Sequence, residues 1–186
     1  MTVLIVGKPD SGKSRRAEEL VMSMPGKHRY YVATMQVADA ASAGRVEKHR
    51  RMREGKGFIT LEIPFDVNKA IECIEDPEQS VVLLECISNL VGNEMYDNPD
   101  RTRPDSVSDQ DIWLRDTADG IVSDIKALAE AVQDLIIVAN RFETDDEGYD
   151  DETVLYVRLN NAINDRIAGF ADRVIDMMPG SKVICP

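Results

Sequence analysis

The sequence predicts an α/β protein, with a mostly parallel sheet that carries helices on both faces. Short apolar segments rich in β-branched residues alternate with segments of helical periodicity. The first apolar segment leads directly into a glycine-rich loop, and helical periodicity follows that loop. No low-complexity tract interrupts the 186 residues, a length that suits one domain, so we expect a single domain over residues 1–186.

Seven short apolar segments are candidate strands. They lie at residues 3–6, 29–34, 58–63, 81–85, 135–139, 173–177 and 182–185. In an open sheet of this kind, ligands bind outside the carboxyl ends of the strands. We therefore expect the functional site near residues 7–14, 34–36, 85–93 and 140–143.

Four apolar stripes at helical spacing separate these strands and predict helices that pack on the sheet. We interpret their apolar residues as core. A stretch rich in Asp, Pro and Ser at residues 97–111 predicts a loop. The stripes are Ala17, Leu20, Val21 and Met24; Val67, Ala70, Ile71 and Ile74; Ile121, Ile125, Leu128 and Val132; and Leu155, Leu159, Ala162, Ile163, Ile167 and Phe170.

Residues 7–14 match the phosphate-binding pattern G-x-x-x-x-G-K-S and predict the P-loop, RecA-like form of the α/β fold. The two glycines can adopt φ values that curl successive N–H groups around a phosphate. Lys13 would reach the β- and γ-phosphates, and the hydroxyl of Ser14 would ligate Mg²⁺. The expected nucleotide-binding residues of the loop are Gly7, Lys8, Pro9, Asp10, Ser11, Gly12, Lys13 and Ser14.

Glu85 ends the apolar strand segment at residues 81–85 and is a candidate metal ligand. A carboxylate at this place could hold Mg²⁺ directly or through water, opposite the phosphate loop. The alternative is an ordinary exposed glutamate at a strand end. Because the chain already carries the loop, we favour Glu85 as the metal-side carboxylate.

His49 lies in a basic segment, residues 45–53, of an otherwise acidic protein. If the segment is helical, Arg45 and Arg53 lie one turn to either side of His49 on the same face. Nearby cations disfavour a protonated imidazole, and a neutral imidazole can act as a nucleophile. The same cations would attract the phosphates of a nucleotide. Taken alone, however, the segment is more typical of a solvated basic helix face.

The composition excludes several classes of function. A net charge of −12, from 22 Lys+Arg and 34 Asp+Glu, argues against a broad nucleic-acid surface. No apolar run approaches a membrane span and no leader pattern is seen, so we expect a cytoplasmic protein without a membrane partner. Asn140 and Arg141 resemble the guanine-reading motif of GTPases only weakly, and no D-x-x-G precedes them, so the GTPase switch order is absent.

Five motifs, in a fixed order and spacing, cover nearly the whole chain. They are the loop at 7–14 with Arg15, Ala17 and Glu18; the strand end at 31–36; Arg45, Val46, His49 and Arg50; residues 83–88 with Asn93; and residues 164–168 before Ala171 and Asp172. Together they resemble the bifunctional adenosylcobinamide kinase/adenosylcobinamide-phosphate guanylyltransferase family of cobalamin biosynthesis.

The resemblance implies phosphorylation of the aminopropanol hydroxyl of adenosylcobinamide, followed by transfer of GMP from GTP to that phosphate. In the family a histidine carries the GMP covalently, and His49 matches its position, which favours the nucleophile over the solvated face. The arginines around it would stabilise the charge that develops on the attacked α-phosphate. Lys13 and His49 are therefore the expected catalytic residues. The resemblance adds Thr34, Met35, Gln36, Arg50, Glu62 and Glu85 to the nucleotide site, with Ser14 and Glu85 holding the metal.

Two segments depart from the family pattern. Arg141 stands where the family commonly has a glutamate, which puts the substrate choice or one of the two activities in question. Residues 144–153 are strongly acidic where many relatives carry a glycine-containing loop, and Asp150 or Asp151 is placed to cap the helix that follows. The acidic segment is open to two interpretations, a solvated loop or a contact with corrinoid or metal.

Two alternative functions remain open at this point. One is a P-loop kinase of another small molecule, in which His49 has no covalent role. The other is a degenerate relative that binds nucleotide but lacks one or both activities. The sequence also leaves open whether ATP replaces GTP in the kinase step. The family tends to assemble as a trimer, which implies a homo-oligomer with sites shared between subunits.

Overall fold

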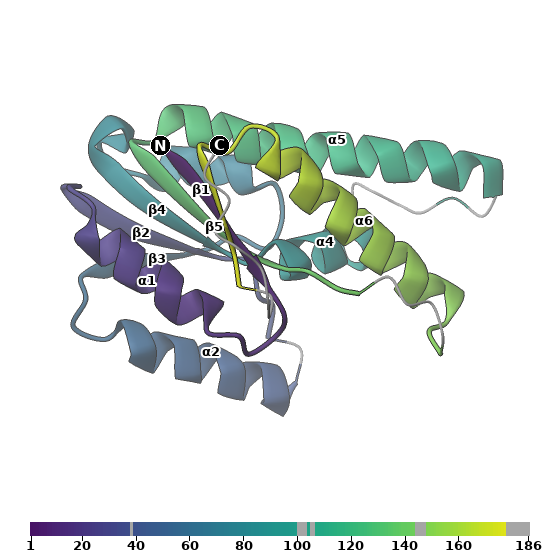
Figure 1. Ribbon diagram of the computed structural model, residues 1–186, viewed down its shortest axis with the longest axis horizontal. Helices are drawn as coiled ribbons and strands as arrows, with labels where there is room; N and C mark the ends of the chain where they lie inside the picture. The colour runs from purple at the N-terminus through teal and green to yellow at the C-terminus, as the bar shows by residue number, and fades with distance from the viewer. Residues whose placement is uncertain (38, 100–103, 105–106, 144–147, 178–186) are drawn as a thin grey trace.

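The computed structural model describes residues 1–37, 39–99, 104, 107–143 and 148–177 and contains a six-stranded sheet (Figure 1). Its strand order is β3-β2-β4-β5-β1-β6, and every neighbouring pair is parallel. The predicted fold class is therefore confirmed, while the strand expected at residues 182–185 lies outside the described residues. The strands are β1 (Thr2–Gly7), β2 (His28–Ala33), β3 (Phe58–Glu62), β4 (Ser80–Glu85), β5 (Asp134–Asn140) and β6 (Arg173–Asp176).

Helices cover both faces of this sheet, because alternate strand residues point to opposite sides. In β1, Val3 and Ile5 pack in one apolar cluster with Ala17 and Val21 of the first helix. Leu4 and Val6 belong to the other apolar cluster, together with apolar residues of the later helices. These helices lie on the opposite face of the sheet from the first helix (Figure 1). The helices are α1 (Lys13–Ser23), α2 (Ala40–Arg53), α3 (Ala70–Cys73), α4 (Ile87–Tyr96), α5 (Val107–Ala131) and α6 (Asp151–Ala168), with 3₁₀ turns at Val67–Lys69 and Pro77–Gln79.

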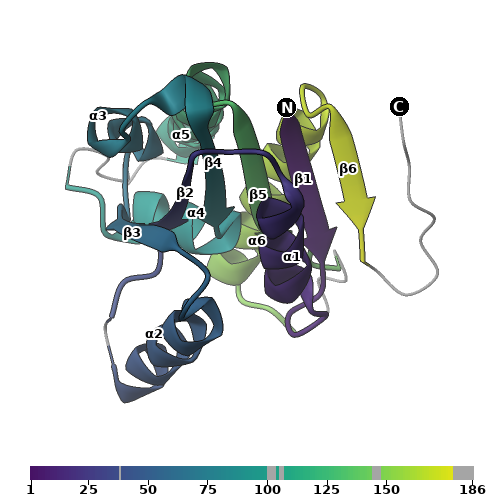
Figure 2. The ribbon, with the colours of Figure 1, turned by 90° about the vertical axis from the view of Figure 1, so that its left-hand side faces the viewer.

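Helix α2 stands apart from the sheet, and neither apolar cluster contains one of its residues (Figure 2). Polar contacts cap its start and tie the chain just after its end to α1. At its start the Asp39 carboxylate accepts a hydrogen bond from Ser42 N at 2.6 Å, and Ser42 Oγ accepts one from Asp39 N at 2.9 Å. Just beyond its end, Lys56 Nζ donates to Oε2 of the buried Glu18 on α1 at 2.5 Å. The helix thus has little apolar packing of its own.

Two predicted helices and one predicted loop need correction. Val67, Ala70 and Ile74 are buried as predicted, but the stripe forms only a 3₁₀ turn and the four residues of α3. Asp66 has a positive φ before the segment, and Ile74 is already extended, with φ −92° and ψ 121°, so the helix ends at Cys73. The loop expected to reach residue 111 ends earlier, because α5 begins at Val107 and has Asp109 in its first turn, where the helix dipole favours a carboxylate.

The third correction concerns α6. Ala162 belongs to its predicted apolar stripe but is exposed, whereas Asn160 and Asn164 are buried at 0% and 1% exposure. The helix therefore turns two amides toward the sheet. Apolar periodicity alone could not identify them, because the pattern counts only apolar side chains.

The strand register brings the expected functional segments to one edge of the sheet. Gly7 at the end of β1 is paired with Asn140 at the end of β5. Ala33 of β2 is paired with Glu85 of β4, whose other neighbour is β5. All strands run the same way, so the loops after β1, β2, β4 and β5 emerge together. In the part of the chain that the structure describes, no helix combines the length and the apolarity needed to cross a membrane.

Candidate nucleotide and transfer site

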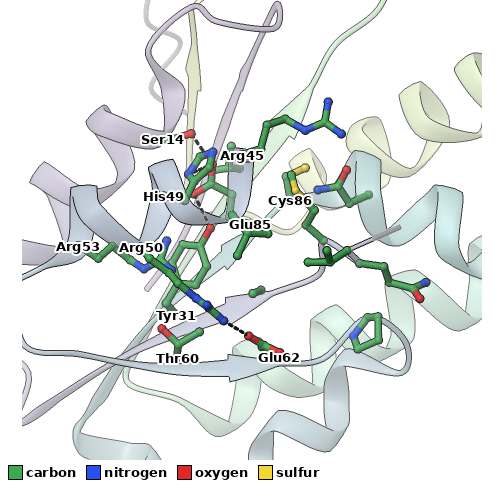
Figure 3. A pocket seen from close by; sticks show the side chains of 18 of the residues that line it. Ser14, Tyr31, Arg45, His49, Arg50, Arg53, Thr60, Glu62, Glu85 and Cys86 are labelled. Atoms are coloured by element: carbon green, nitrogen blue, oxygen red, sulfur yellow. Dashed lines mark hydrogen bonds and ion pairs between the residues drawn. The ribbon is translucent and has the colours of Figure 1, made fainter. Parts of the chain in front are cut away.

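A cavity of about 680 Å³ lies at this edge of the sheet, between the phosphate loop and α2 (Figure 3). Its volume falls within the usual range for small-molecule sites. Of the residues that the sequence singles out, it brings together Pro9, Asp10, Lys13, Ser14, Met35, Gln36, Arg45, His49, Arg50, Arg53, Glu62 and Glu85. Residues from five separate segments of the chain therefore face one space.

The phosphate loop takes the conformation that its sequence requires. Gly12 has a φ of 85°, and Asp10 also adopts a positive φ of 56°. A Cβ on Gly7 would come within 2.9 Å of Ser11 Oγ and 3.1 Å of Met177 Cβ, so any larger residue would force these neighbours to shift. Gly7, Ser11 and Gly12 thus shape the loop without lining the cavity.

Lys13 is 5% exposed, and its ammonium lies inside the loop. Nζ donates to the carbonyl oxygen of Lys8 at 2.5 Å. Burial lowers the pKa of Lys13 from its usual value, because desolvation disfavours the charged form. A phosphate beside this ammonium would raise the pKa of Lys13 again, because a negative charge favours the protonated form.

Glu85 is the centre of the polar contacts in the cavity. The carboxylate is 8% exposed, its Oε1 accepts a hydrogen bond from Ser14 Oγ, and its Oε2 accepts one from Tyr31 OH at 3.2 Å. Nδ1 of His49 lies 3.8 Å from Oε1 (Figure 3). One carboxylate therefore meets groups from α1, β2 and α2. Burial raises the pKa of Tyr31, and the neighbouring Glu85 adds to this effect.

The pair formed by Ser14 and Glu85 has the chemistry of a Mg²⁺ site. Mg²⁺ prefers oxygen ligands, and nucleotide enzymes commonly hold it with one or two protein groups, with phosphate oxygens and water completing the shell. Among the described residues no cluster of three or more His, Cys, Asp and Glu side chains could hold a metal unaided. A metal here would therefore depend on the phosphates of a bound nucleotide.

His49 points from α2 into the cavity with its side chain 23% exposed, and its ring lies close to Glu85 and Ser14 (Figure 3). Its Nδ1 is buried and has no hydrogen-bond partner. Arg45, Arg50 and Arg53 line the same cavity, so the face of α2 that the spacing predicts is the one that carries His49. Arg50 Nη2 lies 2.7 Å from Oε1 of Glu62 on β3.

Arg53 and Tyr31 form a contact that the sequence analysis missed. The guanidinium carbon of Arg53 lies 3.4 Å from the centre of the Tyr31 ring, as in a cation–π pair. Both side chains are buried, at 7% and 4% exposure. Tyr31 belongs to a strand and Arg53 to a helix, and no local pattern relates the two positions.

Thr34 and Lys8 are brought to the site's edge but do not line the cavity. Thr34 is fully buried, and its hydroxyl joins the ends of β2 and β4: Oγ1 donates to the carbonyl oxygen of Cys86 and accepts from its N–H, both at 2.8 Å. Lys8 Nζ lies 2.5 Å from Oε1 of Glu143. The Cys86 side chain does line the cavity, and burial raises the pKa of its thiol to about 11.

Asn140 lines the cavity, and the buried asparagines of α6 hold its backbone. Asn160 Nδ2 and Asn164 Nδ2 donate to the carbonyl oxygen of Asn140 at 2.8 and 2.9 Å. Arg141, next in the chain, turns away: its Nη2 lies 2.5 Å from Oδ1 of Asp165, and it does not line the cavity. Arg141, a base where the family commonly has an acid, therefore adds no cation to the cavity.

Asp150 caps α6, as one of the two alternatives predicted, by accepting a hydrogen bond from Thr153 N at 2.7 Å. The Thr153 hydroxyl and N–H lower the pKa of this carboxyl. Residues 144–147 of the acidic segment lie outside the described residues. A contact between this segment and a ligand stays a prediction.

The family model described as cobinamide kinase / cobinamide phosphate guanyltransferase matches residues 3–184. The bifunctional adenosylcobalamin biosynthesis protein CobU of Escherichia coli (strain K12) is 35% identical over 105 residues, which is 56% of this chain and 56% of that protein. The protein of the same name from Salmonella typhimurium is 33% identical over 96 residues, 52% of this chain and 51% of its own.

These matches span about half the length of the curated relatives. A solved ATPase from the type III secretion system of pathogenic bacteria superposes with a TM-score of 0.56 at 11% identity. The superposition covers 94% of this chain and 50% of the ATPase, and it supports the fold alone.

Proposed function

The chain belongs to the cobinamide kinase / cobinamide phosphate guanyltransferase family, and from this premise we propose that it phosphorylates adenosylcobinamide and then guanylylates the product. GMP would pass from GTP to adenosylcobinamide phosphate through a covalent GMP adduct of His49. One observation carries the proposal: His49 faces the same cavity as the phosphate-loop residues Lys13 and Ser14. A nucleotide held by the loop would thus lie within reach of an imidazole.

In the kinase step, the loop would hold the nucleotide and Lys13 would stabilise the transferred phosphoryl group. The hydroxyl oxygen of the corrinoid attacks the γ-phosphorus and its proton is released to solvent, while the bond to the β-phosphate oxygen breaks and the nucleoside diphosphate leaves. Ser14 and Glu85 would hold Mg²⁺, which neutralises charge on the β- and γ-phosphates when it is bound. The nucleotide of this step is GTP or ATP.

In the guanylylation step, a neutral His49 is the nucleophile. Its Nδ1 faces the Glu85 carboxylate, so Nε2 is the nitrogen with a lone pair directed to the substrate. Nε2 attacks the α-phosphorus of GTP and pyrophosphate leaves. A phosphate oxygen of the corrinoid then attacks the same phosphorus and the P–N bond breaks, which regenerates His49. Arg45 lines the same cavity and would stabilise the charge on the attacked phosphate.

The deciding experiment is to incubate the protein with Mg²⁺ and α-labelled GTP, and to look for label that is acid-labile and base-stable, as a phosphoramidate is. We expect His49→Ala to lose the label and to bind GTP almost as wild type does. His28→Ala is the matched control, because His28 lies at the start of β2 and does not line the cavity. Wild-type protein that binds GTP but takes up no label would contradict the guanylyltransferase half.

The alternative of a degenerate relative depended on Arg141, and the pairing of Arg141 with Asp165 supplies no observation in its favour. Family membership also supports assembly of the chain as a homo-oligomer, with a trimer as the form to test. Light scattering coupled to size-exclusion chromatography measures the mass directly.

A further inference from the structure

Glu18 is a buried carboxylate on α1, the helix that follows the phosphate loop. It is 1% exposed, and its Oε1 is buried without a hydrogen-bond partner. Among the described residues, Lys56 is the one cation within ion-pair distance, with 2.5 Å between Nζ and Oε2 of Glu18. A carboxylate inside a protein is costly unless a cation compensates it. The compensating cation here comes from a distant part of the chain, the turn after α2.

The turn that carries Lys56 is joined to the end of α2. Gly55 and Gly57, on either side of Lys56, have φ values of 73° and 72°, left-handed values that reverse the chain within a few residues. The Lys56 N–H donates to the carbonyl oxygen of Arg53, the last residue of α2, at 3.1 Å. The backbone of Lys56 is therefore fixed to the helix that carries His49.

Helix α2 depends on contacts of this kind, because neither apolar cluster contains one of its residues. The pair of Arg50 and Glu62 has side chains 57% and 67% exposed, and such a pair constrains a helix weakly. The stack of Arg53 on Tyr31 places α2 against β2. The ion pair of Glu18 places the end of α2 against α1, and its buried partner makes it costly to break.

One face of α1 serves both the site and this ion pair. Ser14 and Glu18 are one helical turn apart, so their side chains lie on the same face. Ser14 donates to Glu85, whose Oε1 is 3.8 Å from Nδ1 of His49 (Figure 3). The same helix face thus contacts the carboxylate that faces His49 and the turn that ends the helix of His49.

We propose that Glu18 and Lys56 are positioning residues, whose ion pair sets the place at which α2 presents His49 to a nucleotide on the phosphate loop. Neither side chain lines the cavity, so the pair acts through α2 and touches no reactant. The inference rests on the proposed function for the reaction that it serves. Its consequence is selective: guanylylation needs α2, whereas the kinase step is assigned to Lys13 and Ser14.

The test compares Lys56→Met with wild type in both half-reactions, each in a single turnover at saturating nucleotide. We expect GMP labelling to slow about tenfold or more, because small displacements of a reacting atom are costly, and γ-phosphate transfer to adenosylcobinamide to stay within about twofold. Lys56→Arg keeps the cation and should restore labelling. Lys27→Met is the matched control, because Lys27 Nζ lies 2.5 Å from Oδ2 of Asp76 in an exposed pair that does not line the cavity. Both of its rates should match wild type.

A double variant separates positioning from the cost of an unpaired buried charge. Lys56→Met leaves the Glu18 carboxylate without its cation, which should lower the melting temperature. Glu18→Gln combined with Lys56→Met removes that charge, so it should recover stability and still label slowly. Recovery of labelling together with stability would overturn the proposal. Normal labelling of Lys56→Met, or an equal loss in both half-reactions, would overturn it as well.

Wild-type protein that takes up no label would instead count against the proposed function. Hydrogen exchange then decides the role of the ion pair by itself, because a helix released from α1 opens more often. In the double variant we expect the amides of α2 to exchange about tenfold faster than in wild type, and those of β1 to exchange as in wild type. Equal exchange of α2 in the two proteins would reject the positioning role.

Discussion

Nδ1 of His49 lies 3.8 Å from Oε1 of Glu85, and the same carboxylate oxygen accepts a hydrogen bond from the hydroxyl of Ser14. An imidazole carried by α2 and a hydroxyl carried by the phosphate loop therefore meet one carboxylate at the end of β4. The two proposed half-reactions share this group, because Glu85 would serve the metal in one and face the nucleophile in the other.

Replacement of Glu85 by glutamine tests this shared position. Gln keeps the size and an acceptor oxygen but removes the charge that faces His49 and would hold Mg²⁺. We expect the rate of GMP labelling to fall about 100-fold, within the range for loss of one acid–base or orienting group. The rate of label uptake in a single turnover measures this directly. Glu72→Gln changes an exposed residue that does not line the cavity, and this variant should label normally. Normal labelling of Glu85→Gln would remove Glu85 from the mechanism.

Two glycine substitutions should have opposite effects on stability. Gly12→Ala forces alanine to a φ of 85° although no atom comes closer than 3.9 Å to the new Cβ, so we expect a loss of about 1 kcal/mol from strain and weaker GTP binding. Gly44→Ala lies inside α2 with no atom within 4 Å, and should gain about 0.5–1 kcal/mol from helix propensity. Denaturant unfolding measures both. A stabilised Gly12→Ala would be inconsistent with the loop conformation described.

Nucleotide binding should be accompanied by proton uptake at Lys13. In the free protein burial lowers the pKa of Lys13 below its usual 10.5, and phosphate would raise it by favouring the charged form. Uptake therefore occurs between the lowered pKa and the raised one, and disappears at lower pH, where Lys13 is charged in both states. Calorimetry of GTP binding over a series of pH values up to the usual 10.5, in two buffers of different ionisation enthalpy at each pH, counts the protons. GTP itself also titrates, and its contribution is subtracted first. The binding enthalpy of wild type should then still depend on the buffer, and Lys13→Met should remove that dependence.

Arg141→Ala should leave the proposed chemistry intact. The Arg141 and Asp165 side chains are 39% and 63% exposed, so their ion pair contributes at most about 1 kcal/mol. Because Arg141 does not line the cavity, we expect GMP labelling close to that of wild type. Thermal unfolding and the labelling assay check the two parts. A large loss of labelling with normal stability would mean that Arg141 reaches the substrate after all.

The phosphate loop and the buried strands could be predicted because their signals are local. Gly7, Gly12, Lys13 and Ser14 lie within one octapeptide, and the backbone conformation of the loop follows from which positions are glycine. Glu85 could be proposed because it ends an apolar strand. The family resemblance, which the match over residues 3–184 confirms, added His49 to these residues.

Other parts of the site have no local signal. Asn160 and Asn164 interrupt an apolar stripe, and only the packed α6 shows that their amides hold the carbonyl oxygen of Asn140. Thr34 was expected among nucleotide-lining residues, yet its hydroxyl is used to join β2 to β4. A hydroxyl at a strand end suits either role, and its surroundings decide between them.

By itself the sequence determined that a P-loop, α/β domain would place a phosphate-binding loop, a carboxylate and a basic histidine segment near one edge of a sheet. Only the tertiary structure decided that Tyr31 joins Glu85 to Arg53, and that Arg141 turns toward Asp165. The physical reason is that helical and strand periodicity report which face of one element is apolar. Strand order and register depend on contacts between elements far apart in the chain, and these contacts set which polar side chains meet.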